Sequence, residues 1–333
     1  MLLSLPQELR DHIFTLVCLD ARSEPQPSTY RRECRRTCER QSYSIAPLAR
    51  DRVWFERPSF RNPLLPLLLV NRQVHREARD ALRRMNRPPN YAIDIAFLKD
   101  GTLWPTWLSV PKLQRSLGNV YAQFRIFDVP EHLQPHAMGD PYCSDKPGPP
   151  PIVWLFYHLL AGFLRNGPVV SDRDSDSGGF TVQNLILDFL PASEKGILPF
   201  ASFIQYFKEV EDMAAPPDLE NDWTLGQDEG ESLLAAEYLA HFVRALLLRV
   251  LNLGVSTIKY GKIIYENVGD IEIRVDGRLK WHLDIPKMFS SLSFDHEIHT
   301  SHRLKREQMF AHWKELTLVK RLKAGFPTEC TSS

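Results

Sequence analysis

The sequence has few cysteines and no long apolar run, and both absences narrow the class of protein. Its 333 residues include five cysteines, an odd and sparse set that does not fit a disulfide framework. The segment 233–253 comes nearest to a membrane span, but Glu237, His241, Arg244 and Arg249 interrupt it. The start MLLSLPQEL becomes charged too early for a signal peptide. We therefore expect a soluble protein of the cytoplasm or nucleus that is not secreted, with no membrane partner.

Recognisable catalytic motifs are missing as well. The sequence contains no G-x-S-x-G, no P-loop, no G-x-G-x-x-G after a strand and no H-E-x-x-H. Their absence favours a protein without catalytic residues and without a cofactor. An unrecognised hydrolase or metal-dependent enzyme stays as the least favoured alternative, because residues that meet only in the folded chain leave no local motif.

One histidine cluster is a candidate metal site. The segment DHEIHTSH at 295–302 places His296, His299 and His302 three residues apart. On a helix, steps of three residues drift by about 60° each, so the three imidazoles would not point at one ion. We therefore favour a solvated loop here and expect no metal.

The formal net charge is zero, but the charges are unevenly distributed. Residues 1–90 contain 17 arginines and no lysine against 10 acidic residues, whereas 209–237 contains 10 acidic residues and no basic one. Opposite charges in one chain favour solubility or attraction within the molecule. The arginines are not interleaved with enough aromatic residues to predict a nucleic-acid partner.

Helical periodicity dominates the first part of the chain. Residues 3–17, LSLPQELRDHIFTLV, have apolar residues at helical spacing, and so does the stretch from 66 to 85. Between them, about 20–64 is rich in Arg, Ser and Pro without a sustained apolar period. We predict a helical region over 1–88 that contains a poorly ordered, arginine-rich insert.

From residue 89 the period changes to that of strands. Short β-branched or aromatic segments at 91–98, 120–129, 181–190, 270–275 and 279–285 predict strands, and helical patterns lie at 152–165, 198–211, 231–252 and 301–323. Asp276-Gly277 predicts a hairpin with a primed turn. Polar or proline-rich stretches at 140–151, 171–179 and 212–230 predict loops. The fold class expected is α+β (mixed α/β), with N-terminal helices followed by a body over 89–327 in which helices flank a mixed sheet.

The stretch TLWPTWLSVP at 102–111 places Trp104 and Trp107 in a proline-containing segment that reads as a turn. An exposed tryptophan pair would be a recognition feature. We favour a position over the core, because apolar neighbours surround the pair.

Several of these segments together resemble a known family. The pattern LPxEL with its apolar continuation resembles the opening of an F-box, and LLLVNRQVHREARDAL at 67–82 resembles its closing part. With DIAFLKDGTLWPTWLSVP at 94–111, the chain is similar to a family of fungal F-box-like proteins, most of them functionally uncharacterised. The resemblance implies that one helix face binds a Skp-type adaptor protein through Leu5, Pro6, Leu9, Ile13, Phe14 and Val17.

Two functions follow from these observations. The resemblance implies a non-enzymatic interaction protein, a substrate-recognition subunit of an SCF-type ubiquitin ligase that holds an unknown protein substrate. The alternative is a free-standing globular protein without a role in ubiquitin transfer, in which the first helix simply packs on the second.

Overall fold

The computed structural model describes residues 2–37, 52–57, 65–84, 88–133, 151–168, 179–191, 231–252, 258–294 and 303–327. The α-helices are α1 (Gln7–Leu19), α3 (Leu65–Val70), α4 (Arg72–Arg84), α5 (Pro151–Asn166), α7 (Glu231–Leu251), α8 (Ile258–Asn267), α9 (Ile285–Ser291) and α10 (Arg303–Lys323). Short 3₁₀ turns are η1 (Leu2–Ser4), η2 (Pro27–Thr29) and η3 (Arg32–Cys34). Within these stretches, no helix is long and apolar enough to cross a membrane.

A six-stranded mixed sheet forms the centre of the body, which confirms the α+β class. Its strands are β3 (Tyr91–Leu98), β4 (Thr102–Ser109), β5 (Ser116–Phe127), β6 (Thr181–Phe189), β7 (Val268–Val275) and β8 (Arg278–Leu283), in the order β4-β3-β5-β6-β7-β8. The four central strands are parallel, and both edge strands are antiparallel to their neighbours. The predicted hairpin is confirmed: Asp276 and Gly277 have φ angles of 50° and 74°, as a type I′ turn requires.

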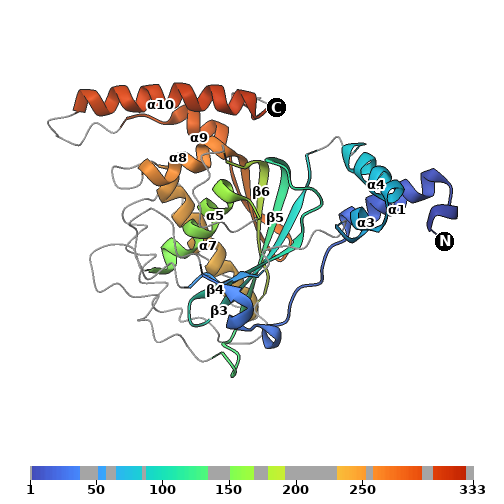
Figure 1. The fold of residues 1–333 in the computed structure, drawn as a ribbon. Helices are drawn as coiled ribbons and strands as arrows, with labels where there is room; N and C mark the ends of the chain where they lie inside the picture. Colours follow the sequence, from blue (N-terminus) through green and yellow to red (C-terminus); the bar gives the residue numbers. More distant parts are fainter. Residues whose placement is uncertain are drawn as a thin grey trace.

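Helices α5, α7 and α8 cover one face of the sheet (Figure 1). The main apolar core lies between them and includes alternate residues of each central strand, such as Ile95 on β3 and Phe124 on β5. Helix α10 adds Phe310 and Trp313 to this core, whereas Met309 and Leu316 are exposed. The buried side of α10 continues instead with Thr317 and Arg321, because these follow Phe310 at helical spacing.

The N-terminal part of the chain covers the opposite face of the sheet over β3 and β5. The expectation of a poorly ordered insert is wrong for residues 20–37 and 52–57, where β1 (Arg35–Arg36) pairs with β2 (Phe55–Glu56). The Arg22 amide donates to the Leu108 carbonyl at 2.9 Å, and the Trp54 amide to Leu103 at 2.8 Å. These residues therefore belong to the body, although they precede residue 89.

Two arginines explain why this polar segment is ordered. Arg35 is buried, donates to the carbonyls of Trp54 and Pro105 at 3.0 and 2.9 Å, and stacks over the Trp104 ring. Arg125 on β5 pairs with the fully buried Asp94 through two short bonds of 2.6 and 2.7 Å and donates to the Pro25 carbonyl at 2.8 Å. Long-range contacts with the sheet hold the segment, and these leave no local period in the sequence.

The predicted second helix is two helices. Asn71 separates α3 from α4, and its side-chain oxygen accepts bonds from the Gln73 and Val74 amides, both at 2.9 Å. This is the geometry of an N-cap, which ends one helical segment and begins the next. Helices α1, α3 and α4 form a small helical unit, which Figure 1 shows on the side of the sheet opposite α5 and α7.

Trp104 and Trp107 lie in strand β4, so the predicted turn is wrong. They are 1% and 7% exposed, which places both in the interior instead of in a recognition feature. Trp104 stacks between Tyr30 and Trp54 at centroid distances of 5.1 and 5.6 Å, whereas Trp107 packs on Phe163 from the helix-covered side. A strand tolerates Pro105 here because β4 is at the edge of the sheet.

Some predicted segments lie outside the described residues. They are the helix at 198–211 and the loops at 140–151, 171–179 and 212–230, apart from Pro151, which begins α5, and Gly179.

Truncation of Trp104 tests the attachment of the N-terminal segment. The Trp104→Ala variant should lose about 3–5 kcal/mol of unfolding free energy, because a buried aromatic side chain is removed from a stack of three rings. Urea unfolding followed by circular dichroism measures this loss. Leu279→Ala, at an exposed leucine of β8, is the matched control and should change stability by less than about 1 kcal/mol. Equal stabilities of the two variants would contradict this packing.

Candidate functional site

The six residues of the predicted adaptor-binding face do not share one environment. Pro6 and Leu9 are exposed, and Leu5, Ile13 and Val17 are half-buried. Phe14 is completely buried against Val74, Ala78 and Ala81 of α4. The prediction for Phe14 is therefore corrected: its ring forms the core of the helical unit and is not available to a partner.

A partly buried ion pair holds α1 on α4. The Nε and Nη2 atoms of Arg10 donate to the two carboxylate oxygens of Glu77, each at 2.7 Å, and Nη1 donates to the Leu5 carbonyl at the start of the helix. The Arg84–Asp11 pair, at 2.7 Å, links the residue after Arg10 to the last residue of α4. The bonds from Arg10 and Gln73 lower the pKa of Glu77 below its usual value. Together these contacts set which side of α1 faces outward.

Helices α1 and α3 carry aliphatic side chains in contact with solvent. Leu9 and Leu16 of α1 are 52% and 55% exposed, and Leu69 and Val70 of α3 are 75% and 63% exposed. Isolated apolar surface residues are common, but three leucines and a valine on two short helices that pack on the same α4 are more than a small solvated unit requires. We call Leu9, Leu16, Leu69 and Val70 the apolar helical surface.

The arginines of α4 form a second exposed feature. Arg72, Arg76, Arg79 and Arg83 recur at helical spacing along one side of the helix and are all exposed. Within the described part of the chain, only Arg83 of the four has an ion-pair partner, Asp80 at 3.6 Å. The acidic residues at 209–230 lie outside that part, and Glu237 pairs with Lys280 at 2.6 Å instead.

A cleft of about 690 Å³ separates the helical unit from the sheet. Leu19 and Arg84 line it from the helices, and Tyr91, Ser109 and Tyr121 from the sheet. The cleft therefore lies beside the sheet face opposite α5 and α7.

That sheet face is polar, which is unusual because parallel sheets are normally covered by apolar groups on both faces. Asp94, Gln123, Asp188 and Arg274 stand side by side on four consecutive strands. Asp188 is almost completely buried, and it accepts bonds from the Tyr121 hydroxyl and from the Gly277 amide at 3.0 Å. Burial, together with the bond to Asp188, raises the pKa of Tyr121.

The charged side chains of this face are bonded to one another. Asp94 forms an ion pair with Arg125 and Glu272 forms one with Arg274, and Asp270 is hydrogen-bonded to His282. Among the described residues, no three His, Cys, Asp or Glu side chains are grouped as a metal ion would require. His296, His299 and His302 lie outside the described residues.

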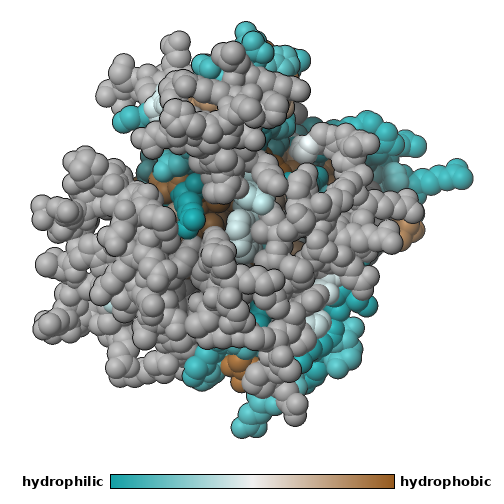
Figure 2. Space-filling model, turned by 90° about the vertical axis from the view of Figure 1, so that its left-hand side faces the viewer, coloured by the Kyte–Doolittle hydropathy of each residue, from teal (hydrophilic) through white to brown (hydrophobic). Residues whose placement is uncertain are grey.

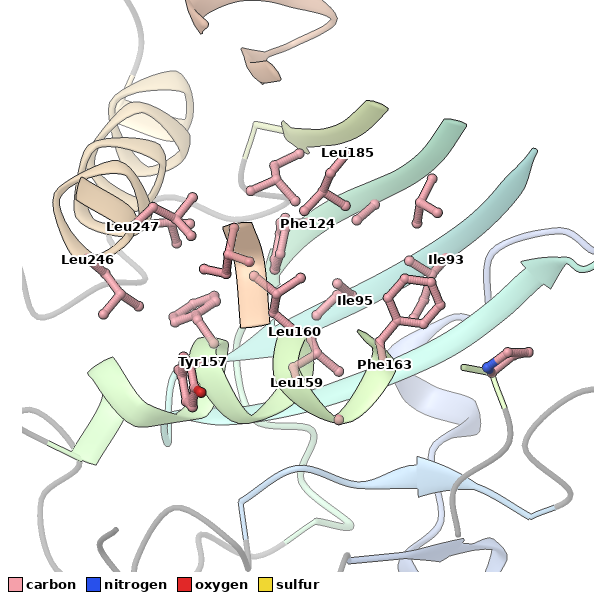
Figure 3. Close-up of a pocket in the computed structure, with 18 of the residues that line it drawn as sticks. Ile93, Ile95, Phe124, Tyr157, Leu159, Leu160, Phe163, Leu185, Leu246 and Leu247 are labelled. Carbon is pink, nitrogen blue, oxygen red and sulfur yellow. The ribbon is translucent and has the colours of Figure 1, made fainter. Parts of the chain in front are cut away.

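A separate apolar cavity lies on the other face, between the sheet and helices α5 and α7 (Figure 3). Its volume is about 90 Å³, and Ile95, Phe124, Leu159, Leu185 and Leu247 are among the residues that surround it. Figure 2 views the molecule from this helix-covered side, where small hydrophobic areas lie recessed between hydrophilic residues.

Sequence periodicity missed the residues that organise these sites. Arg10, Glu77, Asp94 and Asp188 are polar residues whose partners are distant in the chain, so no local pattern marks them. Leu16 belongs to the apolar period of the first helix, which does indicate it.

Comparisons of the chain with protein-family models, with curated proteins and with solved structures found no match.

The Arg10–Glu77 pair predicts a pH-dependent stability of the helical unit. Because the folded-state pKa of Glu77 is lowered, the ionised carboxylate stabilises the fold above its ordinary pKa, and this contribution is lost as the pH falls through the lowered value. The melting temperature of Glu77→Gln should therefore be lower than that of the wild type at pH 7, and this difference in melting temperature should shrink toward pH 3. Thermal unfolding followed by circular dichroism at both pH values measures it.

The exposed Glu315 on α10 provides the control. Glu315→Gln should have the same melting temperature as the wild type at pH 7. A melting difference between Glu77→Gln and wild type that stays the same from pH 7 to pH 3 would contradict the assigned role of the pair.

Proposed function

We propose that the chain is a non-enzymatic interaction protein whose helical unit binds a Skp-type adaptor, and that it acts as an F-box-like substrate-recognition subunit of an SCF-type ubiquitin ligase. The observation that carries the proposal is the apolar helical surface. Leu9 and Leu16 lie on the helix whose sequence resembles the opening of an F-box, and they are exposed while Phe14 of the same helix is buried.

The energetics support a partner for this surface. Covering an exposed leucine or valine side chain contributes about 1.5–3 kcal/mol, so four such residues contribute about 6–12 kcal/mol toward binding before the cost of association is subtracted. The small core of Phe14, Val74, Ala78 and Ala81 holds the unit together without them. The leucines are therefore free to serve binding without being needed for folding.

The body has a distinct role in this proposal. Its polar sheet face, with Tyr121 at the cleft to the helical unit and the exposed Asn184 on β6, offers donors and acceptors to a protein substrate. Adaptor and substrate would then occupy different parts of one molecule, as a recognition subunit requires.

Charge substitution on the apolar helical surface tests the proposal. The double variant Leu9→Asp/Leu16→Asp should lose binding to a purified Skp-type adaptor by about 100-fold or more, because two desolvated leucines are replaced by charges. Biolayer interferometry at micromolar concentrations measures the affinity. Circular dichroism should show an unchanged melting temperature, since both side chains are exposed in the free protein.

The matched control is Leu279→Asp/Leu316→Asp, because these leucines of the body are each 57% exposed. It should bind the adaptor like the wild type. If the wild-type protein does not bind the adaptor at micromolar concentration, the free-standing alternative holds and the ligase role is lost.

A further inference from the structure

We infer that the cavity between α5, α7 and the sheet is a binding site for one small, uncharged, apolar molecule. The inference is independent of the proposed adaptor binding, because the cavity lies on the opposite face of the sheet from the helical unit (Figures 1 and 3). Strands β3, β5 and β6 provide its floor, and α5 and α7 provide its walls.

The size of the cavity sets the size of the ligand. Protein interiors have few voids larger than a water molecule. The volume of about 90 Å³ is several times what one water needs and has room for about six to eight non-hydrogen atoms. One aromatic ring or a short branched alkyl group fits these limits.

The walls of the cavity set the polarity of the ligand. Aromatic and aliphatic side chains of Phe124, Phe156, Leu159, Leu185 and Val243 dominate the lining. The Tyr157 hydroxyl is directed to the Tyr260 carbonyl, at 3.4 Å, and so is already engaged. A buried water needs two to four polar partners, which this lining does not offer, so the cavity favours an apolar occupant over water. A charged ligand would lose its hydration without compensation.

The position of the cavity gives such a ligand a route of entry. Phe55, Phe163 and Asn166 are among the lining residues and are half-buried, whereas Ile95 and Phe124 are buried. The half-buried side chains are therefore where the lining is partly in contact with solvent. Movement of the Phe163 side chain would admit a ring without unfolding the sheet.

Methyl NMR on the wild-type chain tests the site, with toluene as the probe and benzoate as its charged counterpart. Toluene should shift the methyl signals of Ile95, Leu185 and Leu247 and leave those of Val74 and Leu318 unchanged. Benzoate at the same concentration should shift none of them. Absence of shifts with toluene at its solubility limit, or shifts spread over the surface, would overturn the assignment and leave a packing void.

A cavity-filling variant provides the second measurement. Ala122 on β5 lines the cavity, so Ala122→Leu should occupy part of it and weaken toluene binding about tenfold or more. The control is Ala92→Leu, at a half-buried alanine on the opposite face of β3, which should bind toluene like the wild type. Unchanged binding in a folded Ala122→Leu protein would overturn the site. If that variant does not fold, the mapping of methyl shifts on the wild type decides alone.

Discussion

The buried ion pair between Asp94 and Arg125 is the interaction on which the architecture depends. A parallel sheet needs cover on both faces, and a fully buried carboxylate needs a compensating charge. Arg125 satisfies both requirements, because it neutralises Asp94 and also donates to the Pro25 carbonyl of the segment that covers it. Removing the segment would expose the pair to water on one side and leave the aromatic stack around Trp104 half open.

Because of this ion pair, the structural parts of the protein do not follow one another in the order of the sequence. Residues 20–37 and 52–57 belong to the sheet body, although they lie between α1 and α3 in the sequence. The helical unit is then left with its own small core and its own ion pairs, Arg10–Glu77 and Arg84–Asp11. A unit that is folded but little needed by the body can present exposed leucines to a partner. The apolar cavity lies on the other face of the sheet, and its lining is apolar where the first face is polar.

Local sequence patterns predicted the elements whose structure is determined by residues close to one another in the sequence. The alternation at 91–98 predicted β3, and Asp276-Gly277 predicted the turn between β7 and β8, because only residues tolerant of positive φ suit a type I′ turn. Pro105 makes the stretch 102–111 resemble a turn, although an edge strand such as β4 tolerates a proline. The composition of 20–37 predicts poor order, because the contacts that order this segment are made with residues 70 to 100 positions away. For the candidate site, the resemblance includes both the exposed Leu9 and the buried Phe14, since a likeness in sequence does not show which side of a helix packs inward.

The central claim is that the N-terminal segment is part of the sheet body. Hydrogen exchange followed by mass spectrometry on the full chain tests it directly, because the amides of Arg22 and Trp54 donate to the carbonyls of Leu108 and Leu103 in β4. The account predicts that peptides covering 20–37 and 52–57 exchange as slowly as those of β3 and β4, and more slowly than α1. Complete exchange of these peptides within seconds, while β3 and β4 stay protected, would contradict it.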